Sequence, residues 1–175
     1  MNFSEAKRKI QTGDMLAWSH YDWSTWYDLQ VQAVRIGTES EYCHVALAQV
    51  DQDGVVWVIE SVVPVVRRVP LSAVLSAHGC YWAPLKTDFS PAETAYLKSV
   101  IGVAEYSKID AVMAQLNLLT LGASSKLECA ELFILARRLS GLDFGPKATP
   151  AAVVAAVLDA GHELCKILPD KEISQ

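Results

Sequence analysis

The sequence predicts an α+β protein whose strands come first and whose helices follow. Residues 14–85 carry β-rich runs separated by turn residues, whereas residues 90–157 carry helix-start signals and apolar stretches. The length of 175 residues corresponds to about one domain. Because 51% of the residues are hydrophobic, we expect residues 1–175 to fold as a single globular domain with a real core.

Four strands are expected in the β-rich part. Residues 14–18 form a short apolar run directly after a glycine turn, and residues 80–85 form another. The runs at 43–50 and 55–61 flank the turn sequence Asp-Gln-Asp-Gly. Two β-rich runs around such a turn indicate a β-hairpin.

Five helices are expected, over residues 23–36, 91–106, 109–121, 126–141 and 150–157. Ser90 and Pro91 form a helix start, with serine as the N-cap and proline at the first helical position. Residues 125–128 read Ser-Lys-Leu-Glu, which is a capping-box pattern. Thr149 stands before a proline in the same way and predicts the last helix.

Charge and hydropathy exclude several kinds of partner. The formal net charge is −5 and the pI is about 5.3, so nucleic acid is not expected as a partner. The short basic clusters at residues 7–9, 67–68 and 137–138 are interpreted as solvated faces. No apolar run reaches the roughly 18 residues of a membrane span, and no secretory signal follows the N-terminus. These features predict a cytoplasmic protein, with delivery by a phage or by host lysis left open.

The four cysteines are too widely spaced to suggest a disulfide framework, and we expect free thiols. No Cys-x-x-Cys pair occurs, so neither a structural zinc site nor another metal or cofactor is expected.

Cys129 is the leading candidate for a nucleophile. The capping box places it about one turn into a helix, where unpaired N–H groups and the helix dipole favour an anion. This position can lower the pKa of a thiol, especially beside a histidine. An apolar helix face also accounts for a buried cysteine without any function, and that alternative stays open.

A base and a carboxylate are found on the predicted hairpin. His44 lies inside an apolar strand, where an unpaired imidazole is costly to bury, and Glu60 ends the next strand. Together with Cys129 they supply the parts of an activated-nucleophile relay. The competing interpretation is a core histidine that bonds to a backbone carbonyl.

Strand alternation limits which residues can share a pocket with His44. Cys43 and His44 are adjacent, so they point to opposite faces and cannot share one pocket. For Glu60, pairing Val50 with residue 54, or residue 49 with residue 55, places the carboxylate opposite His44. Pairing Val50 with residue 55 would turn it away.

Five strings in order resemble the permuted branch of the NlpC-type papain-like superfamily, which includes relatives of lecithin retinol acyltransferase. Residues 13–18 resemble the first strand of the family, which begins with Gly-Asp, and residues 40–47 resemble its histidine strand. Residues 58–61 match the strand that ends in the third polar residue. Residues 128–133 (Glu-Cys-Ala-Glu-Leu-Phe) are similar to its nucleophile motif, and residues 149–153 to the helix start that follows.

The resemblance implies a small antiparallel sheet or half-barrel packed on helices. It also implies that Cys129 attacks a carbonyl, that His44 takes and returns the proton, and that Glu60 orients the imidazole. Backbone N–H groups at the start of the helix would form an oxyanion hole. The substrate would be a small-molecule, peptide or lipid acyl compound. An aromatic group near the first strand fits a wall of the substrate site and fits an aromatic core or interface equally well. The members of that group are Trp18, His20, Tyr21, Trp23 and Trp26.

The sequence leaves three functions open. The first is a cysteine hydrolase that cleaves an amide, such as a cell-wall peptide, or an ester or thioester. An acyltransferase would use the same first half-reaction and replace water by a second nucleophile. The third is an inactive papain-like module that serves as a structural part of a phage or bacterial particle.

Overall fold

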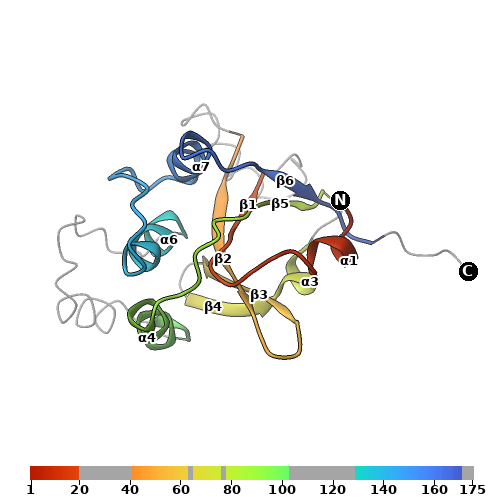
Figure 1. Cartoon of the computed structure of the whole chain (residues 1–175), viewed down its shortest axis with the longest axis horizontal. Coiled ribbons are helices and arrows are strands. Elements are labelled where there is room, and N and C mark those ends of the chain that lie inside the picture. The colour runs from red at the N-terminus through yellow and green to blue at the C-terminus, as the bar shows by residue number, and fades with distance from the viewer. Residues whose placement is uncertain (20–40, 63–64, 76–77, 103–128, 171–175) are drawn as a thin grey trace, which may run out of the picture.

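The computed structural model describes residues 1–19, 41–62, 65–75, 78–102 and 129–170. These residues form an α+β structure built on one six-stranded antiparallel sheet of order β4-β3-β2-β1-β5-β6 (Figure 1). The strands are β1 (Met15–Trp18), β2 (His44–Val50), β3 (Val56–Val62), β4 (Val65–Pro70), β5 (Cys80–Ala83) and β6 (Cys165–Ile167). The described helices are α1 (Phe3–Ala6), α3 (Leu71–Val74), α4 (Pro91–Val100), α6 (Cys129–Arg138) and α7 (Pro150–Asp159).

All four expected strands are present within one or two residues of their predicted bounds. The sequence did not predict β4 or β6. β6 has three residues, too few for an alternating pattern to be recognised. β4 carries Arg67 and Arg68 side by side, and an antiparallel strand turns such neighbours to opposite faces.

Helix α4 starts where the sequence predicts. The Glu93 N–H donates to the Ser90 hydroxyl at 3.1 Å, and Pro91 occupies the first turn. The helix ends at Val100, so the predicted end near residue 106 is wrong. Ile101 is already extended (φ −63°, ψ 127°) and forms a bridge with Val66 of β4. Pairing with the sheet therefore ends this helix earlier than the end near residue 106 that the local sequence predicts.

The other helix predictions have mixed outcomes. α7 begins as expected, with the Thr149 hydroxyl accepting from the Ala152 N–H at 3.2 Å. α6 ends at Arg138, and a turn that leads to Gly141 replaces its expected last residues. The helices predicted over residues 23–36 and 109–121, and the capping box at 125–128, lie outside the described residues.

The sheet has a core on each face. Val45 and Leu47 of β2 belong to the larger core, which also includes residues of α4, α6 and α7. Ala46 and Ala48 alternate with them and belong to the smaller core, near α1 and α3. Figure 1 shows the same division, with α4, α6 and α7 on one side of the sheet and α1 and α3 on the other.

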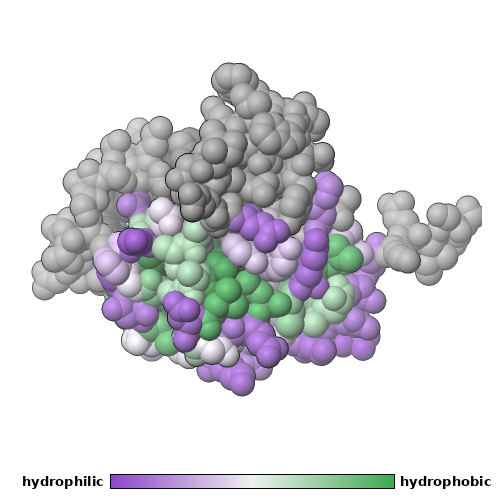
Figure 2. Space-filling view, turned by 90° about the horizontal axis from the view of Figure 1, so that it is seen from above, coloured by the Kyte–Doolittle hydropathy of each residue, from purple (hydrophilic) through white to green (hydrophobic). Residues whose placement is uncertain are grey.

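The outer surface is mixed in character. Seen from above, hydrophobic residues gather near the centre of the visible face and hydrophilic residues surround them (Figure 2). In the described part of the chain, no helix combines the length and the apolar character needed to cross a bilayer.

A buried ion pair joins α4 to α6. The Nη1 of Arg137 donates to both carboxylate oxygens of Glu93, at 2.9 and 3.1 Å, and both side chains are fully buried. The Nη2 of Arg137 donates to the carbonyl of Thr87 at 2.7 Å, and the Ser140 hydroxyl also bonds to Glu93. The solvated interpretation of residues 137–138 is therefore wrong for Arg137, which positions the helix that carries Cys129.

Gly13 makes the close approach that starts β1. Its φ is +93°, and a Cβ at this position would lie 2.2 Å from the carbonyl oxygen of Thr87. The next residue, Asp14, is buried and accepts from the Trp82 indole at 2.8 Å and the Leu85 N–H at 2.9 Å. The Gly-Asp pair thus ties the first strand to β5 and to the segment after it.

Candidate functional site

His44 and Glu60 are in direct contact. The Nε2 of His44 lies 2.6 Å from the Oε2 of Glu60. The Glu60 side chain is 5% exposed and the His44 side chain 22% exposed. This geometry confirms that the carboxylate lies on the imidazole side of the sheet and within hydrogen-bond reach of the ring.

The register that brings them together differs from the predicted ones. Val50 pairs with Val56, so residues 51–55 connect the two strands. Continuing this pairing places Glu60 opposite Ala46, two residues along the strand from His44. The predicted registers are wrong by two positions, but a shift of two leaves every side chain on its expected face.

Cys129 is the first described residue of α6, and its thiol and the His44 ring are close enough that each shifts the pKa of the other. Because Nε2 of the ring faces Glu60, Nδ1 is the nitrogen left for the thiol. The backbone N–H groups of Val45 and Ala130 also favour the thiolate and lower the pKa of Cys129. Two strands and one helix therefore bring together the three residues that the sequence singled out.

The electrostatics of the site favour a charged pair. Burial alone would raise the pKa of Cys129, but hydrogen bonds and the charge of His44 bring it below its ordinary value. Burial alone would lower the pKa of His44, but Cys129 and Glu60 raise it to about 9. Both shifts favour the thiolate and imidazolium forms of the pair over the neutral forms.

Arg67 is a fourth member of the site. It lies opposite Glu60 in the pairing of β3 with β4, and its Nε and Nη2 lie 2.8 and 2.6 Å from the Oε1 of Glu60. Burial raises the pKa of Glu60, but the hydrogen bonds and charges of His44 and Arg67 bring it below the usual range. The carboxylate therefore stays ionised, with one oxygen for each cationic partner.

Sequence reasoning missed Arg67 because residues 67–68 were interpreted as a solvated face. A usable signal was present, however. The run at residues 65–70 reads Val-Val-Arg-Arg-Val-Pro and follows two residues after the strand that ends near a buried glutamate. An antiparallel hairpin at this place would put one of the two arginines opposite the carboxylate.

The remaining thiols are placed differently. The four cysteines are free thiols. The Cys43 thiol, the rival nucleophile, lies 3.3 Å from the backbone carbonyl of Trp18, to which it can donate. Burial raises the pKa of Cys80 to about 12, which disfavours its thiolate. For Cys129, by contrast, the neighbouring groups lower the thiol pKa.

One aromatic residue of the predicted wall lies beside the site. The rings of Trp18 and His44 are 5.5 Å apart between centroids and inclined by 52°. The other members, residues 20, 21, 23 and 26, lie outside the described part of the chain. Within that same part, no group of three or more His, Cys, Asp or Glu side chains is arranged to hold a metal ion.

No protein-family model matches the sequence, and no curated protein matches it significantly. The function proposed below therefore rests on the geometry of the site and on the motifs in the chain.

Proposed function

We propose that the protein is a cysteine hydrolase of the permuted papain-like kind, with Cys129 as its nucleophile. The observation that carries this proposal is the cluster of Cys129, His44 and Glu60, in which the carboxylate lies 2.6 Å from the ring and the thiol and the ring shift each other's pKa. A thiol of lowered pKa beside an imidazole of raised pKa is the arrangement that activates cysteine for attack on a carbonyl.

In the first half-reaction, the Cys129 thiolate attacks the carbonyl carbon of an amide, ester or thioester. The carbonyl π electrons move to oxygen and form a tetrahedral oxyanion. Collapse of this intermediate breaks the bond to the leaving group, which takes the proton held at Nδ1 of His44. The products of this step are an acyl group on Cys129 and a neutral leaving group.

In the second half-reaction, His44 is neutral and accepts a proton from water as the water attacks the thioester. The carboxylic acid leaves, and the sulfur regains its thiolate form beside the imidazolium ion. Glu60 keeps the ring oriented through Nε2 during both steps and stabilises its positive charge. Arg67 binds the other carboxylate oxygen and so holds Glu60 in place.

The order of the elements supports a permuted papain-like arrangement. The histidine strand β2 precedes the nucleophile helix α6 in the sequence, and α6 packs against β2 and β3. The antiparallel sheet with α6 on one face agrees with the architecture that the five motifs imply. Hydrolysis and acyl transfer share the first half-reaction. Analysis of the final product is therefore needed to show whether water or a second nucleophile accepts the acyl group.

An activated ester provides the test. The protein is mixed with p-nitrophenyl acetate, and the release of nitrophenolate is followed in time. We expect a burst of about one equivalent per site, followed by slower turnover to acetate, because acylation and hydrolysis are separate steps. Peptide mapping by mass spectrometry should place the acetyl group on Cys129.

Matched cysteine variants are the control. Cys129→Ala should lose the burst, whereas Cys43→Ser and Cys165→Ser should keep it. Acetylation of another cysteine, or a burst unchanged in Cys129→Ala, would refute the assignment of the nucleophile. A folded protein that is not acylated by any ester, thioester or amide would favour an inactive papain-like module instead.

A further inference from the structure

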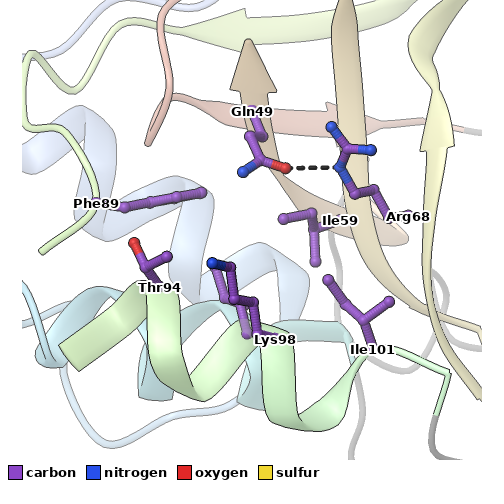
Figure 3. A pocket seen from close by; sticks show the side chains of 8 residues that line it. Gln49, Ile59, Arg68, Phe89, Thr94, Lys98 and Ile101 are labelled. Carbon is purple, nitrogen blue, oxygen red and sulfur yellow. Dashed lines mark hydrogen bonds between the residues drawn. The ribbon is translucent and has the colours of Figure 1, made fainter. Parts of the chain in front are cut away.

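A second concave site lies away from Cys129. A cavity of about 280 Å³ opens between α4 and strands β2, β3 and β4 (Figure 3). Gln49 lines it and stands five residues after His44 on β2, which corresponds to about 17 Å along an extended strand. By strand alternation the two side chains point to opposite faces of the sheet. None of His44, Glu60 and Cys129 lines the cavity, which is therefore separate from the candidate active site.

The walls of the cavity are mostly apolar. Leu97 of α4 lines the cavity. Ile59 of β3 and Ile101, which follows α4, also line it, and the ring of Phe89 closes one side (Figure 3). Small-molecule sites are typically concave and apolar, with a few polar groups that fix the orientation of the ligand. This cavity has that composition.

The polar groups around the cavity are donors. The Nε of Arg68 donates to the Oε1 of Gln49 at 2.7 Å, so the amide oxygen is already used and its NH₂ group is left. The Arg68 guanidinium also lies 3.8 Å from the centre of the Trp57 ring, which fixes its orientation. In Figure 3 the Thr94 hydroxyl and the Lys98 amine point toward the cavity.

The charge of this lining is positive. No aspartate or glutamate belongs to it, and Lys98 forms no ion pair with any described residue. Two cations are thus gathered at an apolar cavity in a chain whose net charge is −5. A ligand that satisfies this site needs one anionic end and an apolar body.

We propose that this cavity binds a small monocarboxylate with an apolar tail. The carboxylate would accept from Arg68 and Lys98, with the Gln49 amide and the Thr94 hydroxyl as further donors. The tail would lie against Ile59 and its apolar neighbours. At about 30 Å³ per non-hydrogen atom, the cavity holds about nine such atoms, which is close to the size of octanoate.

The proposal is tested by titrating the full chain with octanoate and recording the NMR signals of its isoleucine methyl groups. We expect the Ile59 and Ile101 resonances to shift in a saturable way. Ile10 and Ile167 belong to the core on the other face and should not shift. Octan-1-ol has the same tail without the charge, and it should bind at least about tenfold more weakly, because bonds to a charged acceptor are the stronger ones.

Two variants locate the anionic end and the tail. Lys98→Met keeps the stem and should weaken octanoate about fivefold, as expected for an exposed ion pair. Lys147→Met removes an exposed lysine outside the cavity and should have no effect. Thr94→Phe fills the cavity and should abolish the shifts while the melting temperature shows that the variant is folded.

The proposal does not depend on the activity of Cys129, and Cys129→Ala should bind octanoate as the wild type does. Equal binding of octanol and octanoate would overturn it. Shifts that avoid both cavity isoleucines, or a Lys98→Met variant with unchanged affinity, would overturn it as well.

Discussion

Replacing Glu60 by glutamine should lower the pKa of His44. The amide keeps a similar shape but removes the negative charge that lies 2.6 Å from Nε2. With less stabilisation, the imidazolium ion loses its proton at lower pH. Because that ion in turn stabilises the thiolate, the pKa of Cys129 should rise in the same variant.

The size of the effect follows from the burial of the pair. Glu60 is 5% exposed and the His44 side chain 22% exposed, so water screens their contact only weakly. A hydrogen bond to a charged partner contributes about 1.5–3 kcal/mol, and about 1.4 kcal/mol corresponds to one pH unit in pKa. The pKa of His44, about 9 in the wild type, should therefore fall by about one to two pH units.

Two measurements check this. NMR titration of the His44 ring protons gives its pKa, and the rate of Cys129 alkylation by iodoacetamide against pH gives the thiolate fraction. In Glu60→Gln the alkylation rate near pH 6 should drop, because less thiolate is present. Glu163→Gln is the matched control, since this glutamate is exposed. A His44 pKa that is unchanged or higher in Glu60→Gln would refute the reasoning.

Three further changes should alter stability, measured by urea unfolding. Arg67→Gln should cost more stability at pH 7 than at pH 3, because the contribution of the lowered Glu60 pKa is complete above the ordinary carboxyl pKa and is lost as the pH falls through the lowered pKa. Equal losses at both pH values would contradict this. Arg137→Met should cost about 3–5 kcal/mol, since Glu93 is left buried without its cation, and adding Glu93→Leu should recover part of it. Gly13→Ala should cost more than about 2 kcal/mol, whereas Gly141→Ala, also at positive φ but in open space, should cost about 1 kcal/mol.

Local signals in the sequence were sufficient for much of the fold. A serine or threonine before a proline starts a helix through bonds to its own first turn, so Ser90 and Thr149 were predictable. The contact of His44 with Glu60 was predicted for registers of one parity, because strand alternation depends only on whether the register is odd or even, and the sequence left that parity open. Cys129 followed from its motif, and its activity remains a prediction.

Features set by distant parts of the chain were not predictable. The end of α4 depends on Val66, which lies about 35 residues earlier and pairs with Ile101. The burial of Arg137 depends on Glu93, about 44 residues away and on another helix. Neither partner leaves a periodic pattern near the residue that it affects, and periodicity is the main signal in a single sequence.

The two arginines of β4 constrain how this chain can vary. Arg67 faces Glu60, and Arg68 pairs with Ile59 on the cavity side of the sheet. A one-residue shift in the pairing of β3 with β4 would exchange their faces, and only one of Glu60 and Ile59 would keep an arginine opposite it. We therefore expect homologues that carry both arginines and the glutamate to keep the pairing register of these two strands.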